Sequence, residues 1–200
     1  MDSRKHAMQN RILLAAVQCL EQGGLEAVTV RNVTDLAGVN GAAVNYHFGS
    51  KENLLLQVSH RCVGVSFVEP LREMDRLLAE MPSRRSAIVR FLSHYLREML
   101  SQTRALEVCF HNALIRQDYS DGTFPAIQQL LEGFLERARP ILKPGSEEEL
   151  RASVVQIWST IFLIALIPQG FDGFKGSRFV DSEDVDGYVS RLAEHYFLPG

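Results

Sequence analysis

Residues 29–54 read TVRNVTDLAGVNGAAVNYHFGSKENL, and this stretch decides the fold of the first quarter of the chain. Apolar residues recur at helical spacing over residues 30–37, and Gly38 then permits the positive φ that ends a helix. Asn40 is suited to cap a second short helix over residues 41–48. Two short helices joined by about three residues around a glycine predict a helix-turn-helix.

Outside this stretch, apolar residues also recur at helical spacing, and no strand alternation bounded by turns appears. The sequence therefore predicts an all-α fold of about nine helices. A first helix over residues 8–22 ends at Gly23-Gly24, and a long one runs from Ser50 toward Glu80 with a kink at Pro70. The further helices are expected at residues 83–101, 104–118, 124–141, 146–167 and 183–197. We expect two domains, a helix-turn-helix domain over residues 1–50 and a larger helical domain over residues 51–200.

Composition excludes several classes of protein. The 200 residues are 46% hydrophobic and 22% charged, which argues against a disordered chain or a collagen-like repeat. Three widely spaced cysteines fit neither a disulfide framework nor a zinc site and indicate a reducing compartment, so we expect a cytoplasmic protein. The apolar run over residues 154–167 is shorter than the roughly 20 residues of a membrane span, so we expect a buried helix and no membrane partner.

Catalytic motifs are missing from the sequence. It contains no Gly-x-Ser-x-Gly elbow, Gly-rich phosphate loop, His-Glu-x-x-His or metal-spaced carboxylate pair. We therefore expect neither an enzyme nor a bound metal or other cofactor.

The second helix of the motif has the residue types of a DNA reader. An α-helix fits the major groove, and small side chains near its start let the backbone approach the base edges. The predicted base-facing residues are Gly41, Ala42, Ala43 and Asn45, the last offering an amide donor and acceptor. The predicted phosphate contacts are Thr29, Arg31, Asn40, Tyr46, His47 and Lys51.

Charge supports this assignment only slightly. Residues 1–61 carry six Lys and Arg against five Asp and Glu, whereas the remainder carries 15 against 19. Nucleic-acid binding at the N-terminus must therefore depend on local contacts rather than on a strong overall field.

Three elements in residues 8–57 resemble the tetracycline-repressor-like (TetR) family of bacterial transcription regulators. They are Ala37-Gly38-Val39, Tyr46-His47-Phe48 and Ser50-Lys51-Glu52-Asn53-Leu54. The resemblance implies a homodimer that represses genes from a double-stranded, pseudo-palindromic operator and releases it on binding a small molecule. The family often carries a longer residue where this chain has Gly41, so direct readout is expected to depend on Asn45 and on DNA shape.

The region beyond residue 60 is expected to hold the effector and the dimer contact. Aromatic and sulfur side chains there predict a mostly apolar pocket. The predicted ligand-binding residues are Phe67, Phe91, Tyr95, Met99, Phe110, Phe134, Trp158 and Phe162. Apolar stripes on the last two long helices predict a four-helix contact between two chains. The predicted dimer residues are Val155, Ile161, Ala165, Val185, Tyr188 and Leu192.

Three alternatives remain at this point. A helical, ligand-binding dimer that acts through protein contacts would show no sequence-specific DNA binding. An enzyme on the same scaffold would turn over its ligand. An activator would differ from a repressor only in where its operator lies relative to the promoter.

Overall fold

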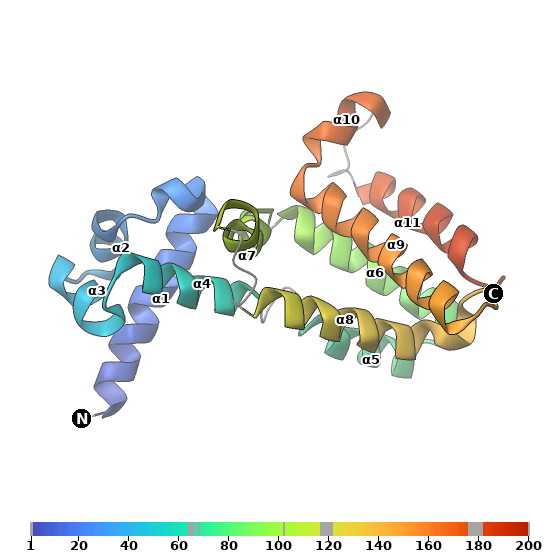
Figure 1. Cartoon of the computed structure of the whole chain (residues 1–200), viewed down its shortest axis with the longest axis horizontal. Coiled ribbons are helices and arrows are strands. Elements are labelled where there is room, and N and C mark those ends of the chain that lie inside the picture. The colour runs from blue at the N-terminus through green and yellow to red at the C-terminus, as the bar shows by residue number, and fades with distance from the viewer. Residues whose placement is uncertain are drawn as a thin grey trace. The chain divides into compact units, whose positions relative to one another are not determined.

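The computed structural model describes residues 2–63, 67, 69–101, 103–116, 122–175 and 182–199. Over these ranges the chain is all-α, as predicted, with eleven α-helices, a short 3-10 helix and an isolated β-bridge (Figure 1). The helices are α1 (Asp2–Ala27), α2 (Val30–Ala37), α3 (Gly41–Phe48), α4 (Lys51–Val63), α5 (Pro70–Glu80), α6 (Arg84–Ser101), α7 (Thr103–Arg116), α8 (Thr123–Ala138), η2 (Arg139–Ile141), α9 (Glu147–Leu166), α10 (Gln169–Lys175) and α11 (Ser182–Tyr196).

The prediction of about nine helices was too low, and the boundaries of the first helix and of the expected long helix differ. The first helix starts at Asp2 and not near residue 8, because polar residues with good helix propensity continue it beyond its apolar face. The expected long helix from Ser50 toward Glu80 is instead α4 and α5, and Pro70 is the first residue of α5. Proline is well tolerated in a first turn, where its missing N–H has no helical partner to lose.

The chain divides into two compact units, and the first contains residues 1–64 and 104–124. In it, α1 packs against α2, α3 and α4. We call helices α1–α3 the head. Its core is formed by fully or almost fully buried apolar side chains, namely Ile12, Ala16, Leu20, Val33, Ala37, Val44 and Phe48. Gly24 interrupts α1 with a φ of 71°, so the predicted break at the glycine pair is present.

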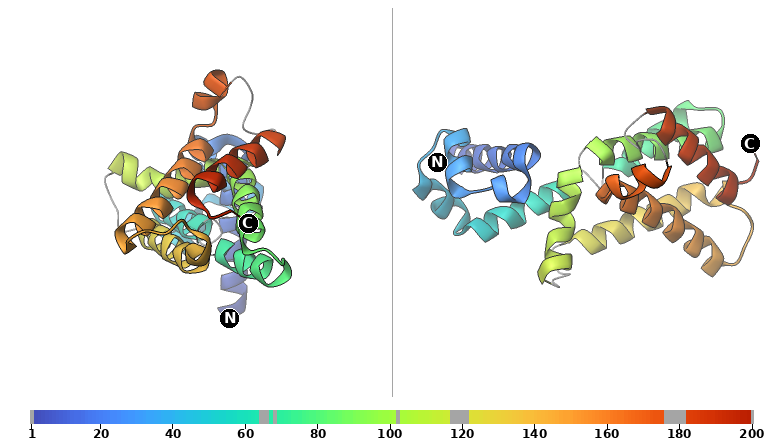
Figure 2. Two further views of the ribbon diagram at one scale, coloured as in Figure 1. Left: turned by 90° about the vertical axis from the view of Figure 1, so that its right-hand side faces the viewer. Right: turned by 90° about the horizontal axis from the view of Figure 1, so that it is seen from above.

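The second unit contains residues 65–103 and 125–200. Helix α6 lies in its middle and packs against α5, α9 and α11 (Figure 2). Ion pairs join neighbouring helices at the surface: Arg137 binds both carboxylate oxygens of Asp75 at 2.7 Å, and Arg97 binds Asp186 at 2.5 Å. The chain end is fixed by the bridge between Leu142 and Phe197.

Helix α9 begins with a capping box. The Ser146 hydroxyl accepts a hydrogen bond from the Glu149 amide at 3.3 Å, and the Glu149 carboxylate accepts one from the Ser146 amide at 2.7 Å. By length and composition the helix could cross a membrane. However, Val154, Ile157 and Ile161 on one side of it are buried within the second unit, so this side is part of a protein core.

The three cysteines are buried free thiols, and we expect them to react slowly in the folded protein. Burial raises the pKa of Cys62 to about 11, and the negative charge of Glu21 adds to the shift. Burial also raises the pKa of Cys19. Because the thiolate is the nucleophile, we expect Cys62 to react with Ellman's reagent about 100-fold more slowly in the native protein than in urea. The absorbance of the released thiolate measures the rate, and immediate release from the native protein would contradict this prediction.

Candidate nucleic-acid interface

Side-chain caps define both helices of the motif. The Thr29 hydroxyl accepts a hydrogen bond from the Asn32 amide at 3.1 Å and begins α2. The Asn40 side-chain oxygen accepts one from the Ala43 amide at 3.1 Å and begins α3. Between them, Gly38 has φ 62° and ψ 43°, a left-handed conformation that favours glycine. The helix-turn-helix predicted from the sequence is therefore present.

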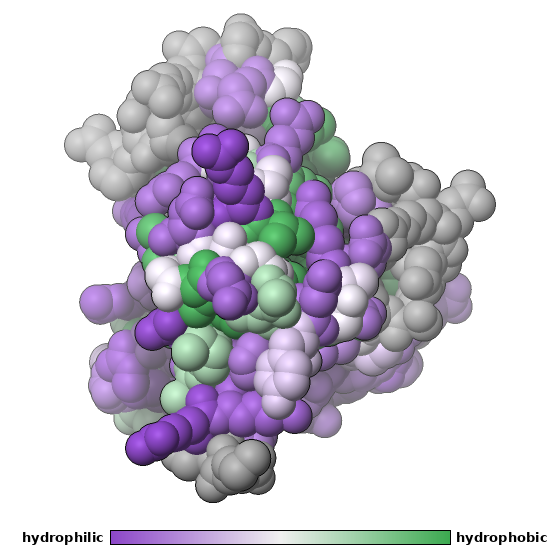
Figure 3. Space-filling view, turned by 90° about the vertical axis from the view of Figure 1, so that its left-hand side faces the viewer, coloured by the Kyte–Doolittle hydropathy of each residue, from purple (hydrophilic) through white to green (hydrophobic). Residues whose placement is uncertain are grey.

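Helix α3 has one buried and one exposed side. Val44 and Phe48 are buried beneath it, whereas Gly41, Ala42, Asn45 and Tyr46 are exposed. We call these four exposed residues the reading face. Tyr46 is 73% exposed, which is unusual for so large an aromatic side chain. Figure 3 views the molecule from the side on which the head lies in Figure 1, and hydrophilic and hydrophobic residues are mixed on this surface.

The other predicted base-facing residue, Ala43, is only partly exposed. Its methyl group therefore has less surface to offer a base than that of Ala42. The three small residues at the start of α3 nonetheless leave its first turn without a long side chain, so the backbone can approach a partner closely.

The predicted phosphate contacts belong to α2, α3 and α4 or cap these helices. Because the Asn40 oxygen caps α3, its amide nitrogen is the group left to donate to a phosphate. Arg31 is exposed, and its ion pair with Asp35 is long, at 3.9 Å. Lys51 is the first residue of α4, directly after Ser50, whose hydroxyl accepts a hydrogen bond from the Asn53 amide at 3.1 Å.

His47 is more restricted than the sequence indicates. Its Nδ1 atom is buried and has no hydrogen-bond partner in the described part of the chain. The imidazole packs edge to face on Tyr46, with ring centroids 5.0 Å apart. A phosphate contact by His47 would therefore have to use Nε2.

Two cations of α1 that sequence reasoning missed lie near α3: Arg11 lines a groove between the two helices, and Lys5 lies beside Tyr46. The groove has a volume of about 540 Å³, and Met8 and Arg11 of α1 line it with Asn40, Ala42 and Tyr46 of the motif, among others. Arg11 donates to the Gly38 carbonyl at 3.4 Å, and the Lys5 ammonium lies 5.8 Å from the centre of the Tyr46 ring. A three-residue spacing places Lys5, Met8 and Arg11 on one side of α1, away from its apolar side. This spacing is the sequence pattern that could have indicated a second cationic surface beside the motif.

Seven of the eight predicted ligand-binding residues belong to the second unit. Five of them form what we call the aromatic cluster: Phe91, Tyr95, Phe134, Trp158 and Phe162. Trp158 is at its centre, and its ring centroid lies 4.9 Å from Tyr95, 5.4 Å from Phe134, 5.5 Å from Phe162 and 6.3 Å from Phe91.

The remaining predicted ligand residues are placed differently. Phe67 packs edge to face on Phe162 at 5.7 Å, and Met99 is buried in α6. Phe110 lies on α7, in the first unit, so the structure does not group it with the other seven. Helical periodicity shows which residues are apolar but not which unit a helix packs into. Phe110 could therefore not be separated from the other seven residues by sequence.

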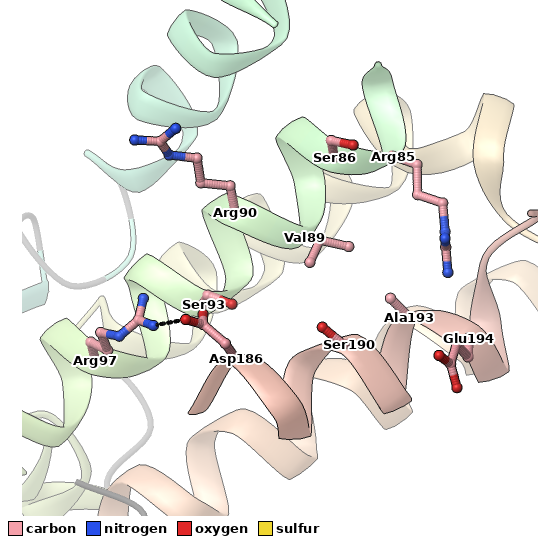
Figure 4. A pocket seen from close by; sticks show the side chains of 10 residues that line it. All are labelled: Arg85, Ser86, Val89, Arg90, Ser93, Arg97, Asp186, Ser190, Ala193 and Glu194. Carbon is pink, nitrogen blue, oxygen red and sulfur yellow. Dashed lines mark ion pairs between the residues drawn. The ribbon is translucent and has the colours of Figure 1, made fainter. Parts of the chain in front are cut away.

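The second unit also has a polar groove between α6 and α11, with a volume of about 620 Å³ (Figure 4). The ion pair of Arg97 with Asp186 lies at one end, and the Arg85 side chain extends into the gap from α6 (Figure 4). None of the predicted ligand-binding residues lines this groove. Among the described residues, no group of three His, Cys, Asp or Glu side chains is arranged to hold a metal ion.

Three of the predicted dimer residues need correction. Ile161, Ala165 and Val185 are fully buried in their own unit and offer no surface to a second chain. Val155 is half exposed, and Tyr188 and Leu192 are partly buried. When a helix is apolar on all sides, its sequence does not indicate which side packs into the core of its own unit.

The structure shows instead an apolar stripe along α9 and just beyond its end. We define it by three residues, Val155, Leu163 and Ile167, which are 50%, 49% and 50% exposed. An exposed row of large aliphatic side chains on one helix is typical of a protein contact.

Comparisons with known proteins match the N-terminal part of the chain to a family and the whole chain to a fold. Residues 12–58 match the model of "Bacterial regulatory proteins, tetR family". The chain is 32% identical over 95 residues to the HTH-type transcriptional dual regulator CecR of Shigella flexneri, a match that covers 46% of this chain and 42% of CecR. It is 34% identical over 80 residues to the HTH-type transcriptional repressor AcnR of Corynebacterium glutamicum, covering 38% of this chain and 43% of AcnR. The matched region thus spans less than half the length of these two relatives.

Solved structures resemble the chain over almost its full length. A TetR-family regulator from Mesorhizobium loti has a TM-score of 0.72 at 14% identity and covers 98% of this chain and 99% of its own. SmeT, the repressor of the Stenotrophomonas maltophilia multidrug efflux pump SmeDEF, has a TM-score of 0.64 at 18% identity, covering 96% and 91%. At these identities the likeness shows the fold alone.

Proposed function

We propose that the chain is a ligand-responsive transcriptional repressor of the tetR family of bacterial regulatory proteins, whose model matches residues 12–58. In this proposal a homodimer binds a pseudo-palindromic operator and leaves it when a small apolar effector binds. The matched family and both curated relatives are transcriptional regulators, which supports a regulator rather than an enzyme. AcnR and SmeT are both named repressors, which supports repression over activation.

The exposed reading face of α3 is the observation that carries this proposal. An α-helix fits the major groove, which is about 12 Å wide, provided that its outward side chains are short or can bond to base edges. Gly41 and Ala42 are short, and the Asn45 amide can donate to and accept from an adenine edge. Lys51 and the Asn40 amide then hold the helix in register through phosphates.

The apolar stripe of α9 supports a dimer. Two copies of the head read one palindrome only if their recognition helices enter successive major grooves, about 34–36 Å apart. A stable dimer of this kind buries roughly 2,000 Å² or more. The stripe would pair with its symmetric copy and would lie at the centre of the contact.

The aromatic cluster is the proposed effector site of the second unit. An effector that changes the spacing of the two heads weakens both half-site contacts together. A coupling of about 1–3 kcal/mol, typical of such switches, changes operator affinity about 5- to 150-fold. The operator is obtained by selection from random DNA duplexes, and failure to enrich any sequence would contradict the proposal.

Two substitutions separate phosphate contacts from base reading. Lys51→Ala is expected to weaken binding to all duplexes alike and to reduce the slope of log affinity against log salt by about one, because one phosphate contact is lost. Asn45→Ala is expected to lower the preference for the selected operator by about 10-fold, because one base contact is lost. Fluorescence anisotropy with matched and mismatched duplexes over a salt series measures both effects.

Arg72→Ala is the matched control for charge, because Arg72 is exposed on α5 in the other unit. It is expected to leave the affinity, the specificity and the salt slope unchanged. If Lys51→Ala and Asn45→Ala changed matched and mismatched duplexes in the same way, the division of roles between them would be wrong.

A further inference from the structure

Trp158 carries a buried polar atom that the protein leaves unsatisfied. The side chain is 1% exposed, and its indole nitrogen, Nε1, has no acceptor within the described ranges. The indole N–H is a donor only, and buried donors in native proteins almost always have a partner. An unpaired one at the centre of a proposed effector site points to an acceptor supplied from outside the chain.

The surroundings of Trp158 restrict what that acceptor can be. Four aromatic rings, from α6, α8 and α9, surround the indole. Among the described residues of the second unit, Ser93 is the one buried polar side chain outside the aromatic group, and it already bonds to Asp186. The aromatic cluster itself contains no cation or anion, and the other unpaired buried donor described in this unit, Arg85 Nε, belongs to the polar groove between α6 and α11. A charge on a ligand in the cluster would therefore be unbalanced, and burying an unbalanced charge is costly.

One side of the cluster reaches the surface. Phe162 is partly exposed, whereas Phe91, Tyr95, Phe134 and Trp158 are almost completely buried. The Phe162 ring packs on Trp158 with ring centroids 5.5 Å apart, so the partly exposed ring of the cluster is in direct contact with the indole.

We infer that the effector is a neutral, largely apolar molecule whose carbonyl or ether oxygen accepts a hydrogen bond from Trp158 Nε1. It enters beside Phe162 and packs against the remaining rings. This inference rests on the proposed function, which makes the aromatic cluster the effector site. The competing explanation is internal: the rings of Tyr95 and Phe134 stand at 82° and 89° to the indole, so one of their faces could accept the N–H.

A matched pair of probes distinguishes the two explanations. Benzophenone and diphenylmethane have similar size and differ in the carbonyl group, and 4-benzoylbenzoate adds a negative charge. We expect benzophenone to bind the full-length protein saturably and about tenfold more tightly than diphenylmethane, as one hydrogen bond to an unpaired buried donor would produce. We expect 4-benzoylbenzoate to bind at least about tenfold more weakly than benzophenone, because its charge is uncompensated.

Calorimetry measures all three affinities, and tryptophan fluorescence locates the binding, since Trp158 is the sole tryptophan of the chain. Trp158→Phe is expected to reduce the preference for benzophenone over diphenylmethane from about tenfold to about onefold, because it removes the N–H that only the carbonyl probe can use. The ratio of the two affinities is the readout, since the smaller ring changes the affinity for both probes. Tyr95→Phe is the matched control. It removes a different polar group from the same cluster and is expected to keep the preference.

The inference is overturned if neither neutral probe binds, if both bind the native protein equally, or if Trp158→Phe keeps the preference. Equal binding would support the internal ring contact. The effector role is tested separately by measuring operator affinity with each probe at saturation. Selective benzophenone binding without any change in operator affinity would retain the role of Trp158 and reject the proposed switch.

Discussion

The Ala42→Glu variant is expected to bind its operator at least about 100-fold more weakly than the native protein, while the head stays folded. Ala42 lies in the exposed first turn of α3, on the side that faces the bases in our proposal. A glutamate there adds four heavy atoms beyond the alanine methyl and holds the helix away from the groove. It also brings a negative charge toward the phosphates, and like charges forced together cost several kcal/mol.

Folding of this variant is not expected to suffer, because a carboxylate in the first turn of a helix interacts favourably with the helix dipole. Anisotropy at one fixed salt concentration measures the loss of DNA binding, and circular dichroism checks the fold. Ala79→Glu makes the same change at an exposed site on α5, and we expect it to keep full affinity. Native affinity in the Ala42→Glu variant would remove α3 as the DNA-reading helix.

The Leu163→Glu variant is expected to be monomeric and to lose about 100- to 10,000-fold in affinity for a two-half-site operator. Leu163 is in the middle of the apolar stripe on α9 and is half exposed, so the change does not disturb the core of its own unit. In a symmetric dimer two such carboxylates would be buried close together without a counter-charge. A monomer engages one half-site at a time and loses the gain from linking two binding events.

Sedimentation equilibrium and operator titration test this prediction together. Leu198→Glu is the matched control, because Leu198 is also an exposed leucine but lies outside the stripe. We expect it to leave the dimer and the operator affinity intact. A Leu163→Glu protein that remained dimeric would show that the stripe is not the subunit contact, whereas a monomer with native affinity would show that one head is sufficient.

The parts of the fold that depend on residues close together in the sequence could be predicted. The caps at Thr29 and Asn40 and the left-handed Gly38 each obey a rule that spans three or four positions. The buried positions Val44 and Phe48 follow directly from helical spacing. Most of the reading face could therefore be identified before the structure was known.

Features that depend on tertiary packing could not be predicted in this way. Lys5 reaches Tyr46 only because α1 begins at Asp2 and passes beside α3. The spacing of Ile161 and Ala165 shows that they are apolar, but not that the core of their own unit covers them completely. The unpaired state of Trp158 Nε1 depends on side chains from three helices that are far apart in the sequence.

In the proposed function Asn40 both caps α3 and binds a phosphate, and these two roles limit how the chain could acquire a new operator preference. The Asn40 side-chain oxygen begins α3, so selection for a stable fold and selection for DNA affinity both act on one residue. A new operator preference is more easily acquired at positions 41, 42 and 45, whose side chains are free of any capping role. Divergent descendants of this chain should accordingly vary at those three positions while keeping a short polar side chain at position 40.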